Sequence, residues 1–162
     1  MGQQSRAGLP GAAGFTLVEL VVVLVILGVL AAIAAPRFFD SITFLQRGYY
    51  EELASALKYS QKLAVASGCP VRVTIAAGSY QVRQQAAQSG TCDLSDTTWP
   101  TAVLLADGQT LGGTSPNGVS ASPAATMTFD ALGRTNLGSD QTISIGPFAL
   151  TVQADSGFVQ AP

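Results

Sequence analysis

Histidine is absent from this chain of 162 residues, and charged residues make up only 11% of it. Without histidine, the chain lacks the commonest general base and the commonest metal ligand. It also has no Cys-x-x-Cys motif, and the glycines at residues 108–118 have neither the Walker A nor the GxGxxG spacing. These absences argue against an enzyme, and we expect no cofactor.

Asp93 and Asp96 are the nearest approach to an acidic pair or a calcium site. They lack the further oxygen ligands that a calcium loop of the EF-hand type requires. We therefore interpret both as residues of a surface loop and expect no metal site.

Basic residues are few and form no cluster. They are Arg6, Arg37, Arg47, Lys58, Lys62, Arg72, Arg83 and Arg134. Nucleic-acid-binding proteins need a basic patch that contacts phosphates. From residue 15 onward the chain has 7 basic and 10 acidic residues, and residues 157–162 carry no charged side chain. The sequence therefore argues against nucleic acid as a partner.

The chain has two cysteines, Cys69 and Cys92. An even number of cysteines in an exported domain favours a disulfide bond between them. The alternative is two free, buried thiols. Which of the two applies depends on whether the domain leaves the cytoplasm.

One long apolar run occupies residues 20–35, and three interpretations compete for the helix expected there. A buried core helix is the weakest, because the run is apolar on every face and nothing else in so small a chain would cover it. A cleavable secretory signal is a stronger alternative, with Arg6 as its basic start and residues 32–34 (Ala-Ile-Ala) as its cleavage site.

A membrane anchor explains the run best. Residues 15–35 would form a helix of about 31 Å, which spans a bilayer core. Glu19 lies in its first turns, where a carboxylate is costly unless it has a partner, and a disposable signal has no need of one. We predict a transmembrane helix over residues 15–36, with a kink at Pro36, whose ring removes one backbone hydrogen bond.

Residues 1–14 are small and polar and show no core-forming pattern, as in a leader peptide. Residues 14–19 (Gly-Phe-Thr-Leu-Val-Glu), followed by the apolar run and Pro36, resemble the processing motif of type IV prepilins. The resemblance implies that prepilin peptidase cleaves between Gly14 and Phe15 and methylates the new N-terminus at Phe15. It also implies that Glu19 pairs with the N-terminal amine of a neighbouring subunit during assembly.

An amphipathic helix is expected over residues 37–68, with Gly68 as its C-cap and Pro70 ending it. Its apolar face has a period of 3.6 residues. This face comprises Ile42, Leu45, Tyr49, Leu53, Ala56, Leu57, Ser60, Leu63 and Ala64. The opposite face is charged and comprises Arg47, Glu51, Lys58 and Lys62.

Beyond residue 69 the pattern becomes that of a β-rich domain, residues 69–162. Alternating apolar and polar residues predict a hairpin over residues 71–75 and 80–83. Further strands are expected at residues 102–106, 126–129, 142–145, 148–152 and 158–160. We expect the polar residues 108–123 to form a long mobile or partner-facing loop. The predicted fold is α+β and pilin-like, a long helix packed on an antiparallel sheet.

Residues 126–134 and 155–159 resemble the H-subunit/FimT-type minor pseudopilins of type II secretion and type IV pili. Residues 47–69 also resemble minor pilins of the mannose-sensitive haemagglutinin type. Major pilins often carry their disulfide near the C-terminus, so the position of Cys69 and Cys92 favours a minor subunit. A DNA-uptake role, known for some FimT-type subunits, is the alternative.

The resemblance thus implies a structural subunit of a type IV pilus or a type II secretion pseudopilus, in the filament or its tip complex. Its expected partners are other pilins or pseudopilins, prepilin peptidase and the bacterial inner membrane. A single membrane pass would leave the globular domain in the periplasm.

Overall fold

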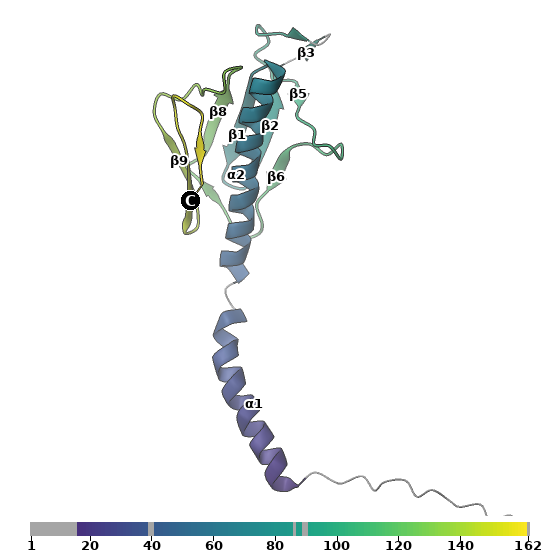
Figure 1. Cartoon of the computed structure of the whole chain (residues 1–162), viewed down its shortest axis with the longest axis vertical. Helices are drawn as coiled ribbons and strands as arrows, with labels where there is room; N and C mark the ends of the chain where they lie inside the picture. The colour runs from purple at the N-terminus through teal and green to yellow at the C-terminus, as the bar shows by residue number, and fades with distance from the viewer. Residues whose placement is uncertain (1–15, 39–40, 86, 89–90, 162) are drawn as a thin grey trace, which may run out of the picture. The chain divides into compact units, whose positions relative to one another are not determined.

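Two compact units make up the chain, one within residues 1–40 and one within residues 41–162. The computed structural model describes residues 16–38, 41–85, 87–88 and 91–161 (Figure 1). In the first unit, α1 (Leu17–Phe38) contains 22 residues. Its side chains from Leu17 to Leu30 are exposed, for example Leu24 at 60%.

The structure does not show the membrane span predicted over residues 15–36. Within the described residues, no helix has the length and hydropathy that crossing a membrane requires.

The second unit begins with α2 (Ser41–Ser67), which buries one face and exposes the other. The buried residues are Tyr49, Tyr50, Leu53, Ala54, Ala56, Leu57, Ser60 and Ala64. The four predicted charged positions are all exposed, and Arg47 lies 3.9 Å from Glu51. Ile42 and Leu45 were expected on the buried face but are 38% and 37% exposed, because burial of α2 starts only at Tyr49.

Gly68 ends α2 as predicted, since its φ of 67° is the left-handed conformation of a helix C-cap. The chain then enters a hairpin of β1 (Val71–Ala76) and β2 (Ser79–Gln84). The alternation of valines with polar residues produces this pair, because one strand face must be buried against α2. Val71, Val73 and Val82 are fully or almost fully buried.

The strand pairs within the described part of the chain are all antiparallel, and they form two main sheets. The first has the order β5-β2-β1-β8, with β6 also paired to β2. Its additional strands are β5 (Thr101–Ala102), β6 (Gly112–Thr114) and β8 (Ala125–Phe129). The second has the order β11-β10-β9-β7. Its strands are β7 (Ala121–Ser122), β9 (Gln141–Ile145), β10 (Phe148–Val152) and β11 (Val159–Gln160).

The hydrophobic core lies between α2 and both sheets, because α2 contacts strands of each one. In Figure 1, α2 lies across β1 and β2, with β8 and β9 on one side of it. Leu53, Leu57, Met127, Ile143 and Leu150 are completely buried. Full burial of one such side chain contributes about 1.5–3 kcal/mol. The predicted α+β class, a helix packed on antiparallel strands, is confirmed.

The prediction of a long loop at residues 108–123 is wrong in part. This segment contributes β6 and β7, and it buries Leu111, Val119 and Ala121. Its strands are two or three residues long, which is too short for period-2 alternation to be seen. The strand expected at residues 102–106 is shorter than predicted, because only Thr101–Ala102 forms a ladder and Leu104 makes an isolated bridge to Thr110.

Candidate functional site

The N-terminus of α1 has a side-chain cap. The backbone N–H of Glu19 donates to Thr16 Oγ1 at 3.2 Å. Threonine followed three residues later by glutamate is the capping-box pattern, in which the hydroxyl satisfies an otherwise unpaired helix N–H. The pattern is visible in the sequence, although it was not among the features predicted above. Only the backbone N–H of Glu19 takes part in this bond, and the side chain of Glu19 is exposed.

The other predicted residues of this region are only partly described by the structure. Gly14 and Phe15, the predicted cleavage and methylation site, lie outside the described residues. Pro36 lies within α1, two residues before its last residue Phe38, and its kink stays a prediction.

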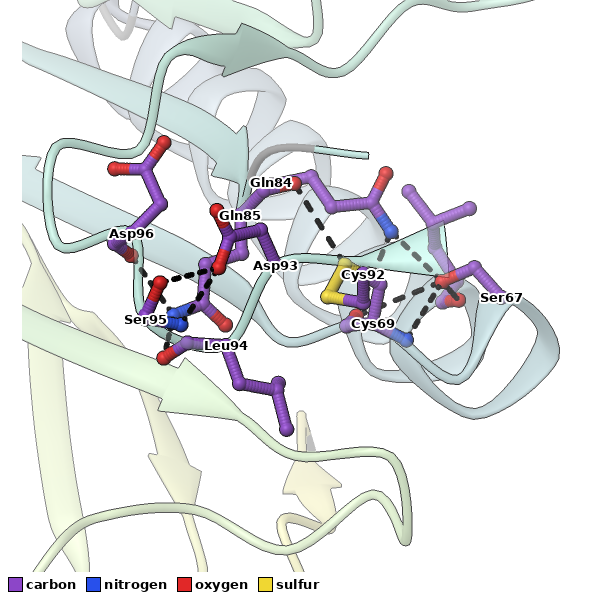
Figure 2. The surroundings of a disulfide bond; sticks show 10 residues. Ser67, Cys69, Gln84, Gln85, Cys92, Asp93, Leu94, Ser95 and Asp96 are labelled. Atoms are coloured by element: carbon purple, nitrogen blue, oxygen red, sulfur yellow. Dashed lines mark hydrogen bonds between the residues drawn. A yellow bond between two sulfur atoms is a disulfide. The ribbon is translucent and has the colours of Figure 1, made fainter. Parts of the chain in front are cut away.

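Cys69 and Cys92 form the predicted disulfide bond, with their Cα atoms 5.4 Å apart. The bond joins the segment that follows α2 to β4 (Thr91–Cys92), which pairs with β3 (Ala87–Gln88) in a hairpin that the sequence analysis missed. Cys69 is 2% exposed. The disulfide thus ties this peripheral hairpin to the end of the main helix (Figure 2).

Gln85 holds the loop that follows Cys92. Its side-chain Nε2 donates to Leu94 O at 3.2 Å and to Asp96 O at 2.8 Å, while its backbone N–H donates to Pro70 O. The residue is 7% exposed. Figure 2 shows Gln85 between the disulfide and this loop. A buried amide that donates to two loop carbonyls helps to fix the loop in place.

Asp93 and Asp96 stabilise turns in the same loop. Asp93 Oδ1 accepts hydrogen bonds from the hydroxyl and the N–H of Ser95, and Asp96 Oδ1 accepts two from Thr98. The bonds from Ser95 lower the pKa of Asp93 below its ordinary value. Among the described residues, no group of three His, Cys, Asp or Glu side chains is arranged to hold a metal ion.

The two segments that resemble the H-subunit type lie against each other. Gln61 of α2 donates from Nε2 to Gly133 O and to Ser156 O, each at 3.0 Å. A Cβ atom at Gly157 would collide with Gly133 O, so only glycine lets the two turns approach this closely. The φ of Gly157, 66°, is also a conformation that favours glycine. The sequence placed these motifs far apart, and the fold joins them at one side of α2.

Asp130 stabilises the first of these turns. Its carboxylate accepts hydrogen bonds from the N–H groups of Leu132 and Arg134 and forms an ion pair with the Arg134 guanidinium at 3.0 Å. Partial burial opposes ionisation of Asp130, but the bonds from Arg134 and Leu132 outweigh it and lower the pKa of the carboxyl group. The arrangement makes a rigid surface turn and assembles no nucleophile with a base.

Two family models match this chain. Residues 50–159 match "Type II transport protein GspH", a match that includes most of α2 and the strands of both main sheets. Residues 10–35 match "Prokaryotic N-terminal methylation motif".

Similar proteins include the "Type IV narrow pilus major component PilA5" of Thermus thermophilus. It is 41% identical over 61 residues, which is 36% of this chain and 53% of PilA5, so the chain spans about half the length of this curated relative. The minor pilin FimU of Pseudomonas aeruginosa has the same fold. One of its crystal structures aligns with a TM-score of 0.51 at 16% identity, covering 76% of this chain and 92% of FimU. The minor pseudopilin EpsH of Vibrio cholerae aligns with a TM-score of 0.49 at 17% identity, covering 72% and 94%.

Proposed function

This chain belongs to the GspH family of type II transport proteins, and we propose that it is a minor subunit of a type II secretion pseudopilus or a type IV pilus. Members of the GspH family are structural subunits rather than enzymes. One observation carries the proposal: a single chain joins an N-terminal methylation motif at residues 10–35 to a GspH-type domain at residues 50–159.

In this proposal, prepilin peptidase removes residues 1–14 and methylates Phe15. Cleavage between Gly14 and Phe15 puts Glu19 at the fifth position of the processed chain. Residues 15–36 then anchor the protein in the inner membrane, and the disulfide-bonded domain lies in the periplasm. The disulfide supports this location, because such bonds persist in oxidising compartments.

Glu19 acts in assembly. An unpaired carboxylate among apolar helices is costly, and so is an unpaired ammonium group at the processed N-terminus. Pairing the Phe15 ammonium of one subunit with Glu19 of its neighbour offsets both costs and sets the axial register. The Thr16 cap is compatible with this role, because it engages the Glu19 N–H rather than the carboxylate, and the Glu19 side chain is exposed.

Mass spectrometry of the protein extracted from membranes tests the processing step. The expected N-terminal peptide begins at methylated Phe15. Gly14→Ala should block cleavage, because the motif requires glycine before the cut, while the matched variant Gly11→Ala in the leader should be processed normally. An N-terminus at Ala35 or Pro36 would instead identify a secretory signal and overturn the proposal.

A further inference from the structure

Two arginines lie directly opposite each other on the outward face of the first sheet. The face of β1 and β2 that meets α2 is apolar, with Val73 and Val82 buried. Arg72 alternates to the other face and pairs in register with Arg83 across the two strands. Like charges at directly opposed positions destabilise a sheet. A pair of this kind needs a compensating interaction.

Trp99 and its neighbour Pro100 provide part of that compensation. The Arg72 guanidinium lies 4.1 Å from the centroid of the Trp99 ring, a cation–π arrangement. Arg83 Nη1 donates to Trp99 O at 3.3 Å and to Pro100 O at 3.2 Å. Trp99 is only 6% exposed. The indole ring and two carbonyl groups therefore hold the two guanidinium groups in place without neutralising their charge.

No carboxylate neutralises these arginines within the described chain, where the ion pairs are Arg47–Glu51 and Arg134–Asp130. Arg72 Nε is buried and has no hydrogen-bond acceptor among the same residues. The neighbouring outward positions carry neutral side chains. In register these are Thr128 beside Arg72, Thr126 beside Thr74, and Gln81 across from Thr74. This surface is therefore positively charged, and the guanidinium groups of Arg72 and Arg83 have N–H donors that no carboxylate of the described residues engages.

We propose that this outward sheet face docks an acidic segment of a neighbouring filament subunit, whose carboxylate binds Arg72 and Arg83 beside Trp99. The inference rests on the proposed function for the identity of the partner. Charge complementarity supports it, because a carboxylate accepts paired hydrogen bonds from guanidinium groups and removes the repulsion between the two arginines. Two cations on a chain of formal net charge -2 are a poor surface for a polyanion such as nucleic acid.

Trp99 is the only tryptophan of the chain, so its fluorescence reports on this face. The full chain in a non-ionic detergent is titrated with tetraglutamate peptide, and we expect a saturable change in Trp99 emission as the guanidinium beside the ring moves. Arg83→Gln should weaken binding roughly tenfold, the scale of one lost charge-assisted hydrogen bond. Arg72→Gln should abolish the response. Arg134→Gln, at the exposed turn after β8, is the matched control and should bind as the parent does.

Thermal unfolding of each variant checks that the sheet is intact, and Arg83→Gln keeps the test valid if Arg72→Gln does not fold. The proposal is overturned if tetraglutamate causes no saturable change, or if folded Arg83→Gln and Arg134→Gln bind it equally well. Tighter binding of inorganic phosphate or a DNA oligonucleotide than of tetraglutamate also overturns it. The titration does not depend on processing at Phe15, so its failure is distinguishable from failure of the proposed function.

Discussion

The two helices among the described residues are similar in length, 22 and 27 residues, but their apolar side chains are arranged differently. In α2 the apolar residues form one stripe, and Leu53 and Leu57 have no exposed surface. In α1 they occur on every face, and Leu24 and Leu27 are 60% and 56% exposed. A helix that is apolar all round has to be covered by something other than water.

This difference indicates that the two helices have different roles. Side chains of α2 contribute to folding, because strands of the same chain cover them. On the proposed function, lipid and neighbouring subunits cover α1, so its side chains contribute to anchoring and assembly. Substitutions in α2 should therefore change the stability of the domain, and substitutions in α1 should change the protein's behaviour in the membrane and the filament.

Leu57→Ala should give the largest loss of stability. It removes a completely buried side chain between α2 and the sheets, and such a truncation costs about 2–5 kcal/mol. Thermal unfolding followed by circular dichroism would measure this loss. Leu24→Ala in α1 is the matched control, with a change of the domain's stability below about 0.5 kcal/mol. Equal losses for the two variants would contradict the separation of roles.

Removing the disulfide should give the second largest loss of stability. Replacing Cys69 and Cys92 together by serine frees a loop with a sequence separation of 23, and chain entropy gives a loss of about 3 kcal/mol. The check is chemical denaturation of the double variant beside the parent. Parent protein kept in a reductant should unfold at the same midpoint as the variant. A parent that is insensitive to reductant would show that the bond contributes nothing to stability.

Sequence reasoning predicted the parts of this fold that follow a long, regular period. The stripe on α2, the hairpin of β1 and β2 and the end of α2 at Gly68 all follow from local patterns. Two buried residues of α2, Tyr50 and Ala54, were missed because a second sheet covers a wider arc of the helix than one sheet would.

The parts that were missed depend on contacts between distant segments. No local signal shows that Gln85 would hold the loop at residues 94–96, or that Gln61 would bind the turns at Gly133 and Ser156. Short strands such as β6 and β7 contain too few residues to show a period. Only the Thr16–Glu19 cap had a sequence signal that was available and went unused.

Asp130→Asn should have a smaller effect, about 1 kcal/mol, because it weakens hydrogen bonds and an ion pair in an exposed turn. The pKa of Asp130 is lowered in the folded protein. Its contribution is therefore present above the ordinary aspartate pKa and is lost as the pH falls through the lower, folded-state value. Unfolding measured between about pH 2 and pH 6 should show a weaker pH dependence in this variant than in the parent. The control is Asp155→Asn in the neighbouring turn, and the same weakening in both variants would refute the assignment.

Glu19→Gln should have the smallest effect on stability and the clearest effect on assembly. Glutamine preserves the shape of the side chain and the backbone N–H that donates to Thr16, so α1 should keep its cap. The carboxylate lies on α1, outside the compact unit of residues 41–162, so unfolding of that unit should change by less than about 0.5 kcal/mol. Loss of the negative charge removes the proposed partner of a neighbouring Phe15 ammonium. We expect normal processing and a normal amount of protein in the membrane, but reduced co-purification with partner pilins.

Glu51→Gln, which removes an exposed carboxylate from α2, is the matched control and should co-purify as the parent does. A reduced amount of the Glu19→Gln protein itself would show a role in stability, and undiminished co-purification would show that Glu19 has no part in assembly.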